Sequence, residues 1–91
     1  MSGYYIYILE CSDKTLYTGW ARNVEQRVRE HNIGKNGAKY TRSRRPVKLV
    51  YIEKAASLSE VLKRESRIKN LSREEKLLLI RDAAEFFIPT L

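Results

Sequence analysis

The sequence has one cysteine, Cys11, among 91 residues, so an intramolecular disulfide is excluded. It also lacks an apolar run near the roughly 20 residues that a membrane-spanning helix needs, and no segment pairs a basic helix face with an exposed aromatic one. The N-terminus shows no basic segment followed by an apolar stretch and a cleavage site. We therefore expect a cytoplasmic protein that does not bind membranes.

Acidic residues are few relative to basic ones. The chain has 11 Asp and Glu against 18 Lys and Arg, which gives a formal net charge of +7. Such a charge attracts polyanions over about a Debye length, roughly 8 Å at physiological salt. A chain of this size buries roughly 60 to 65 % of its unfolded surface, enough for one small core. We expect a single domain over residues 1–91 that binds nucleic acid, with DNA favoured over RNA. A homodimer or a complex with a partner protein remains open.

Three strands are expected from runs of β-branched and aromatic residues, at residues 4–10, 15–19 and 46–54. In the first run both alternating faces are apolar, which is typical of a central strand with both faces covered. The turn after it predicts a β-hairpin with the second run. Tyr7 and Tyr17 then lie either directly opposite or diagonal to each other, depending on the loop length.

Three helices are expected from capping-box spacing, which pairs Asn23 with Gln26, Ser57 with Glu60, and Ser72 with Glu75. They should end at about residue 32, residue 71 and residue 89. Residues 34–45 show no apolar periodicity and are expected to form a loop. The order strand, strand, helix, strand, helix, helix predicts an α+β domain, with a three-stranded antiparallel sheet flanked by helices.

The first expected helix has polar residues on the stripe that should be apolar. Val24, Arg27, Val28 and His31 are spaced i, i+3, i+4 and i+7, so they share one face. Singly, Arg27 could bury its stem and extend its head to water, and His31 could interact with the helix C-terminus. Together on a short helix they favour a polar pocket.

The second expected helix carries an acidic residue on its inward stripe. That stripe consists of Leu58, Val61, Leu62 and Ile68, and Glu65 lies at its centre. Burying an unpaired carboxylate costs several kcal/mol, so a partner is needed. The partner is either a cation such as Arg27 or Lys69, or a metal such as Mg²⁺, which takes carboxylate oxygens as ligands. The residues alone leave both readings open.

The expected loop of residues 34–45 contains no acidic residue. Its basic and aromatic side chains are Lys35, Lys39, Tyr40, Arg42, Arg44 and Arg45. Such a loop can follow a phosphate backbone with its cations and stack a base on its aromatic ring. We expect it to bind nucleic acid.

Tyr7, Tyr17 and Arg27 follow one another at intervals of ten residues, which suggests a shared site. With the segments YYIYIL, LYTGW, GAKYT and LKRESRIKNLS, the sequence resembles the small stand-alone bacterial members of the GIY-YIG nuclease family over nearly its whole length. The family fold is a three-stranded antiparallel sheet flanked by helices. The resemblance implies a metal-dependent endonuclease that hydrolyses phosphodiester bonds of DNA or structured nucleic acid with one Mg²⁺ or Mn²⁺.

The resemblance also implies a role for each matching residue. Tyr7 would activate the attacking water, Tyr17 would orient that water or the phosphate, Arg27 would hold the scissile phosphate, and Glu65 would bind the metal. A phenol with a pKa near 10 is ionised in only about one molecule in a thousand at pH 7, a cost of roughly 4 kcal/mol. His31, with an ordinary pKa near 6.5, therefore either acts as the base or accepts the proton of Tyr7.

The sequence departs from the family pattern at several positions, including Leu77, where some members carry an asparagine. Tyr5 and Thr18 stand where the two motifs usually have glycine and isoleucine, and Trp20 stands where several members carry a catalytic lysine. A non-catalytic nucleic-acid-binding module of the same fold is therefore the alternative function. An adaptor that docks proteins through the apolar C-terminal helix is a third.

Overall fold

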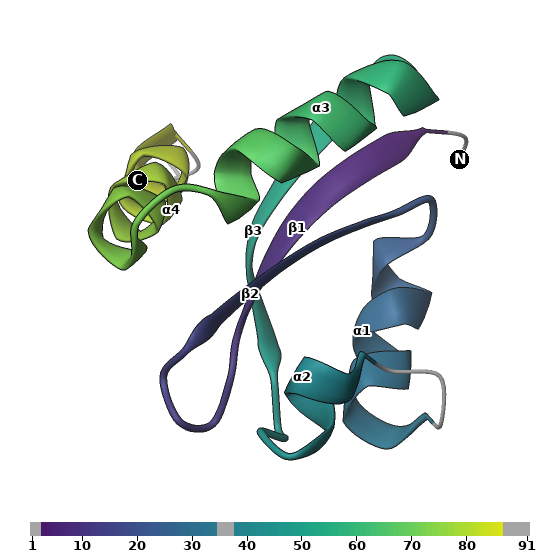
Figure 1. Ribbon diagram of the computed structural model, residues 1–91, viewed down its shortest axis with the longest axis vertical. Coiled ribbons are helices and arrows are strands. Elements are labelled where there is room, and N and C mark those ends of the chain that lie inside the picture. Colours follow the sequence, from purple (N-terminus) through teal and green to yellow (C-terminus); the bar gives the residue numbers. More distant parts are fainter. Residues whose placement is uncertain (1–2, 35–37, 87–91) are drawn as a thin grey trace, which may run out of the picture.

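The computed structural model describes residues 3–34 and 38–86, and it confirms the expected α+β architecture (Figure 1). In chain order the elements are β1 (Tyr4–Glu10), β2 (Leu16–Ala21), α1 (Val24–Ile33), α2 (Lys39–Arg42), β3 (Lys48–Ala55), α3 (Leu58–Lys69) and α4 (Arg73–Phe86). Over these described ranges, no helix combines the length and the apolar character needed to cross a membrane.

The three strands form one antiparallel sheet in the order β2-β1-β3, so β1 is central as expected. In the β1–β2 register Tyr7 lies opposite Gly19, and Leu9 lies opposite Tyr17. Tyr7 and Tyr17 are therefore diagonal neighbours on the same face, which decides between the two registers that the sequence allows.

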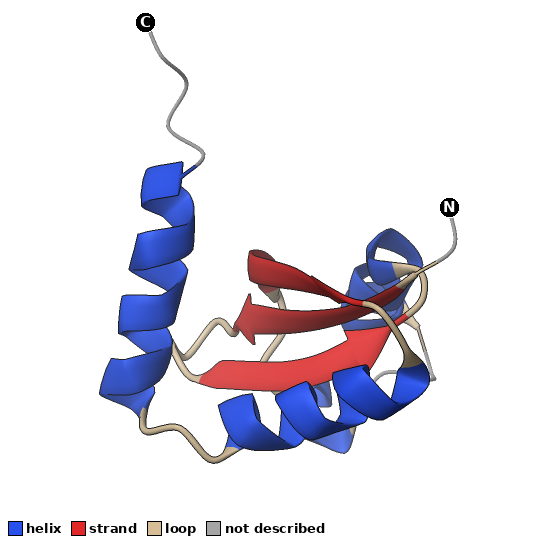
Figure 2. Cartoon of the chain, turned by 90° about the horizontal axis from the view of Figure 1, so that it is seen from above, coloured by secondary structure: helices blue, strands red, loops and turns tan. Residues whose placement is uncertain are grey.

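Helices cover both faces of the sheet, with α1 and α2 on one side and α3 on the other (Figures 1 and 2). Ile6 and Ile8 of β1 are fully buried in the core that includes α3, whereas Tyr7 and Leu9 are buried in the core that includes α1. Burying each of these aliphatic side chains contributes about 1.5–3 kcal/mol. The sheet therefore separates two interiors that share one central strand.

Each of the three long helices begins at the cap that the sequence predicts. The Asn23 side chain accepts a hydrogen bond from the Gln26 amide at 3.0 Å, and the Ser57 hydroxyl accepts one from the Glu60 amide at 3.2 Å. At α4 the box is reciprocal: the Ser72 hydroxyl accepts from the Glu75 amide, and the Glu75 carboxylate accepts from the Ser72 amide. Local hydrogen bonding thus fixes where these helices start.

Three local expectations need correction. Residues 34–45 are not entirely a loop, because residues 39–42 form the single turn of α2, which is too short to show a helical period. Leu58 and Leu62 are 45 % exposed, so the inward stripe of α3 is formed by Val61 and Ile68 with polar neighbours. Strand β2 continues to Ala21 and β3 begins only at Lys48. The expected end of the last helix near residue 89 lies outside the described residues.

Candidate active site

The hydroxyl of Tyr7 is the centre of the site. Tyr7 is 1 % exposed at the middle of β1, and its phenol crosses the neighbouring strand at Gly19. A β-carbon added to Gly19 would lie 2.6 Å from Tyr7 Oη and 2.7 Å from its ring carbon Cζ, closer than real β-carbons approach other atoms. The absence of a side chain at Gly19 therefore creates the space that the phenol occupies.

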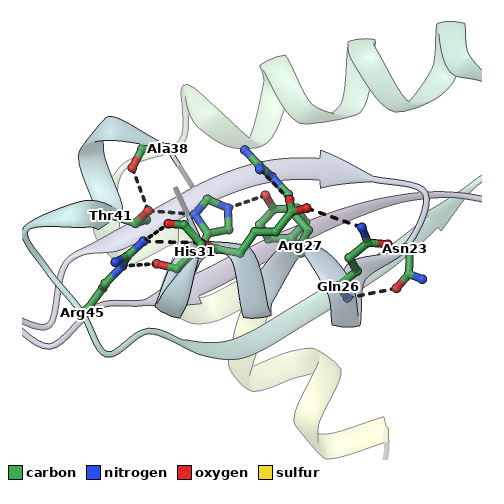
Figure 3. A network of polar contacts seen from close by, with 10 residues as sticks. Asn23, Gln26, Arg27, His31, Ala38, Thr41 and Arg45 are labelled. Carbon is green, nitrogen blue, oxygen red and sulfur yellow. Dashed lines mark hydrogen bonds and ion pairs between the residues drawn. The ribbon is translucent and has the colours of Figure 1, made fainter. Parts of the chain in front are cut away.

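A chain of hydrogen bonds leads from Tyr7 into the α1–α2 layer. Tyr7 Oη lies 2.9 Å from His31 Nε2, His31 Nδ1 lies 2.8 Å from Thr41 Oγ1, and Thr41 Oγ1 lies 3.0 Å from the carbonyl oxygen of Ala38. Figure 3 shows the part of this chain from His31 to Ala38. Both His31 and Thr41 are fully buried. Polar side chains on this side of α1 are therefore buried, and they are hydrogen-bonded to one another.

The environment keeps both members of the Tyr7–His31 pair neutral. Burial raises the pKa of Tyr7 to about 12, with further contributions from Tyr17 and Glu65 and an opposing one from Arg27. Burial lowers the pKa of His31 to about 4, and the positive charge of Arg27 acts in the same direction. At neutral pH the pair therefore holds a phenol and an uncharged imidazole.

Arg27 lies on the same stripe of α1 as His31, as the sequence predicts. Its Nη1 donates to Glu30 Oε1 at 2.9 Å, and the guanidinium also lowers the pKa of Tyr7, against the larger effect of burial. The guanidinium side chain remains 29 % exposed. A cation with one side toward the tyrosine and another toward solvent can bind an anion next to the phenol.

Glu65 is the carboxylate of α3 whose charge acts on both Tyr7 and Tyr17. Its side chain is only 17 % exposed, and its negative charge raises the pKa of both Tyr7 and Tyr17. Lys69 Nζ lies 3.8 Å from Glu65 Oε1, while Arg27 pairs with Glu30. The carboxylate thus has a distant cation one turn away on its own helix, and its charge acts on both phenols.

A metal at Glu65 would rely on this one carboxylate. Over residues 3–34 and 38–86, no group of three or more His, Cys, Asp or Glu side chains could hold a metal ion. Mg²⁺ commonly takes one or two protein carboxylates and completes its octahedral shell with water and phosphate oxygens. A partly buried carboxylate of this kind fits such an ion.

Tyr17 is half-buried between the site and helix α2. Its ring contacts the His31 ring edge-to-face at 5.2 Å and stacks on Tyr40 at 5.8 Å between centroids. The guanidinium carbon of Arg44 lies 4.0 Å from the Tyr40 ring centroid, and Arg44 also pairs with Asp13 at 3.0 Å. Tyr40 and Arg44 therefore attach α2 to the β1–β2 hairpin.

Arg45 also makes internal contacts. It donates to the carbonyl oxygens of His31, Gly34 and Glu30 at the end of α1 (Figure 3), where a cation also complements the helix dipole. Of the residues expected to bind nucleic acid, Lys39 and Arg42 are exposed on α2, whereas Lys35 lies outside the described residues. The basic segment is thus partly a support for the site.

The sequence analysis missed two residues of the site, Gly19 and Thr41. Gly19 has a signal in the sequence, because it closes the YTG segment two residues after Tyr17, but its role depends on the diagonal register. Thr41 has none: it follows Tyr40 in a segment without periodicity, and only folding brings it to His31.

This chain is similar to known proteins over most of its length. The family model described as GIY-YIG catalytic domain matches residues 3–77. A UPF0213 protein from Syntrophus aciditrophicus is 67 % identical over 93 % of this chain and 98 % of its own, and one from Staphylococcus haemolyticus is 52 % identical over 90 % and 99 %. UPF0213 is a designation that names no reaction.

Two solution NMR structures are similar to this fold. A protein from E. faecalis has a TM-score of 0.66 and 33 % identity, and the match covers 100 % of this chain and 96 % of that one. A UPF0213 protein from Bacillus halodurans has a TM-score of 0.56 and 42 % identity over 87 % and 83 % of the two chains.

Proposed function

Because this chain belongs to the GIY-YIG family, which is generally one of nucleases, we propose that it is a metal-dependent endonuclease for DNA or structured nucleic acid. The observation that carries the proposal is the buried contact of 2.9 Å between the Tyr7 hydroxyl and the neutral imidazole of His31. Arg27 and Glu65 act on the same hydroxyl from two other elements. Hydrolysis of a phosphodiester needs these functions together: a proton acceptor, a cation for the phosphate and a metal ligand.

Tyr7 receives the proton of the attacking water and gives its own proton to His31. A preformed tyrosinate is excluded as the resting state, since a pKa of about 12 places its formation about 7 kcal/mol uphill at pH 7. Transfer to Nε2 of His31 avoids a free tyrosinate. A bound phosphodiester adds negative charge near the pair, which raises the His31 pKa and strengthens it as an acceptor when substrate is present.

Arg27 binds the scissile phosphate, and Tyr17 orients the phosphate or the attacking water. Negative charge grows on the phosphoryl oxygens in the transition state, so a fixed guanidinium stabilises that state more than the ground state. Glu30 holds the guanidinium from the α1 side at 2.9 Å. The cation is thereby positioned before substrate arrives.

Glu65 holds one Mg²⁺ or Mn²⁺. When bound, the ion supplies Lewis-acid stabilisation of the phosphate oxygens. The carboxylate side chain is 17 % exposed and its cation neighbour Lys69 is 3.8 Å away, so a divalent ion would meet weak competition. Its charge would also offset the effect by which Glu65 now raises the pKa of both phenols.

The exposed Lys39 and Arg42 of α2 bind the phosphate backbone next to the site. Tyr40, which is 38 % exposed, borders the same surface but already stacks on Tyr17. Backbone contacts of this kind carry no base specificity. We therefore propose that the protein recognises the shape of the nucleic acid and prefers DNA to RNA.

The experiment that tests this function replaces the carboxylate by its neutral isostere. Glu65→Gln should lower Mg²⁺- or Mn²⁺-dependent cleavage of labelled duplex, branched DNA and RNA by about 10²- to 10³-fold. Glu74→Gln, an exposed carboxylate on α4, is the matched control and should cleave like wild type. EDTA should stop both.

Full metal-dependent cleavage by the Glu65→Gln variant would show that Glu65 is not the metal ligand. Salt-dependent binding of nucleic acid by the wild-type protein, with no products under any metal, would instead identify a binding module of the same fold. Titrations at several salt concentrations beside the cleavage assay separate these results.

A further inference from the structure

We propose that Thr41 is a positioning residue that places the proton of His31 on Nδ1, so that Nε2 can accept a proton from Tyr7. The proposal rests on the function given above, because it concerns the proton acceptor of that reaction. It assigns a role to the α2 turn, which is buried at Thr41 although the surrounding segment is basic and exposed.

The hydrogen-bond partners of Thr41 set the direction of the chain. A backbone carbonyl only accepts, so at 3.0 Å the hydroxyl of Thr41 donates its one proton to Ala38. Thr41 Oγ1 must therefore accept from His31 Nδ1–H, 2.8 Å away. A neutral imidazole with its proton on Nδ1 has a lone pair on Nε2, the nitrogen that faces Tyr7.

The other end of the chain favours the same direction. The Arg27 guanidinium has donors only, and its positive charge acts on Tyr7 and lowers the Tyr7 pKa, so the phenol oxygen is favoured to turn its lone pairs toward Arg27. The proton of the Tyr7 hydroxyl then goes to His31 Nε2 at 2.9 Å. The carbonyl at one end thus assigns the tautomer of His31, and the positive charge of Arg27 at the other end favours the same one.

The opposite tautomer would leave this network unsatisfied. With the proton on Nε2, the Tyr7 oxygen would face two donors, and its own proton would lose its acceptor. Thr41 would also have to turn from Ala38 to Nδ1, while the Ala38 carbonyl would keep the backbone amides of Thr41 and Arg42 as donors at 3.1 and 3.2 Å. The buried phenol proton left without an acceptor would cost about 1–3 kcal/mol.

The surrounding contacts hold Thr41 in place. Tyr40 stacks on Tyr17, Arg44 pairs with Asp13, and Arg45 binds the carbonyls at the end of α1. These residues flank Thr41 in the sequence, and each connects the α2 segment to another element. The hydroxyl of Thr41 therefore approaches His31 from a supported turn.

The test uses the single histidine of the chain, which makes its imidazole nitrogens unambiguous in spectra of protein labelled with ¹⁵N-histidine. In the wild-type protein at pH 7, we expect Nδ1 to be protonated and Nε2 to be unprotonated. Thr41→Val keeps the shape but removes the hydroxyl, and should shift the ring toward the Nε2-protonated form. Thr41→Ser keeps the hydroxyl and should restore the wild-type tautomer.

Cleavage assays provide the second measurement. Thr41→Val should lower kcat about 10- to 100-fold, by analogy with removal of a partner that orients a metal-ligating histidine, with KM little changed. Thr41→Ser should recover most of the loss. Circular dichroism melting checks that each variant is folded.

A wild-type spectrum with the proton on Nε2 would overturn the proposal, as would an unchanged tautomer in folded Thr41→Val. If Thr41→Val does not fold, the wild-type and Thr41→Ser spectra still decide the tautomer. Absence of cleavage by every variant, together with the expected spectra, would count against the proposed function and leave the role of Thr41 in orienting His31 intact.

Discussion

The two faces of strand β1 differ in what keeps them buried. On the α3 face, Ile6 and Ile8 pack with Val61 and Ile68 and need no specific partner. On the α1 face, Tyr7 and His31 are equally buried, but each polar atom has a hydrogen-bond partner. Apolar burial stabilises by area, whereas buried polar groups are stable only while every partner is present. The first face is therefore stabilised by buried area, and the second depends on a complete set of hydrogen bonds.

The largest expected effect comes from one substitution on each face. Tyr7→Phe should lower cleavage about 10²- to 10⁴-fold by removing the proton relay, while the unfolding free energy falls by about 1–3 kcal/mol because His31 Nε2 loses its partner. Ile8→Ala should lower the unfolding free energy by about 2–5 kcal/mol, while the folded fraction keeps its specific activity. Urea unfolding and cleavage rates per folded molecule measure both. Equal effects of the two substitutions on activity would remove the distinction between the faces.

A pH titration should sharpen the comparison, because only the α1 face contains a buried imidazole. The pKa of His31 is about 4 in the folded protein against 6.5 in the unfolded chain, so the unfolded state binds the proton first as pH falls. Between pH 6.5 and 4 the unfolding free energy should fall by about 3 kcal/mol. Arg27 and Arg45 favour this low pKa, and Glu30 opposes it.

Urea unfolding at several pH values checks this expectation, with His31→Gln as the variant that does not titrate. Carboxylates such as Asp13 and Glu53, whose pKa values are lowered, contribute an acid slope to both proteins. The difference between the two plots of unfolding free energy against pH isolates the contribution of His31. If the two plots run parallel, the fold does not keep the imidazole neutral.

A smaller effect is expected where the two tyrosines meet the backbone. Gly19→Ala places a β-carbon 2.6 Å from Tyr7 Oη, so the phenol must move away from His31. We expect about 1–3 kcal/mol of lost stability together with reduced cleavage. Gly3→Ala is the control, since its β-carbon would meet only side-chain atoms of Tyr5 and Lys54, at 3.1 Å or more. If the Gly19→Ala variant melts and cleaves like the wild-type protein, the role of Gly19 is contradicted.

The fold was largely predictable from local chemistry. Alternating apolar residues identified the central strand, and three polar caps identified the helix starts, because these signals depend on neighbours in the sequence. The turn α2 was not predictable, since four residues contain no helical period. Leu58 and Leu62 were expected on the inward-facing stripe of α3. Each is 45 % exposed, because α3 packs on the sheet through Val61 and Ile68.

The site was predictable where side chains share one helix face or one strand. Arg27 and His31 lie together for that reason, and Tyr7 and Tyr17 meet through the hairpin. Contacts between distant segments were not predictable: Thr41 reaches His31, and Arg45 reaches the end of α1, only after the chain folds. All catalytic and binding roles stay predictions. They concern Tyr7, Tyr17, Arg27, His31 and Glu65 in catalysis, and Lys35, Lys39, Tyr40, Arg42, Arg44 and Arg45 in binding.

The hydrogen-bond chain from Tyr7 ends at the carbonyl oxygen of Ala38, a group too weakly basic to take a proton. Under the proposed mechanism, a proton that reaches the fully buried His31 has no onward route through Thr41. It can leave only by returning through the phenol. The network would therefore hold one extra proton, on His31, which must leave before the next phosphodiester is cleaved. This deprotonation step would set an upper bound on the turnover rate.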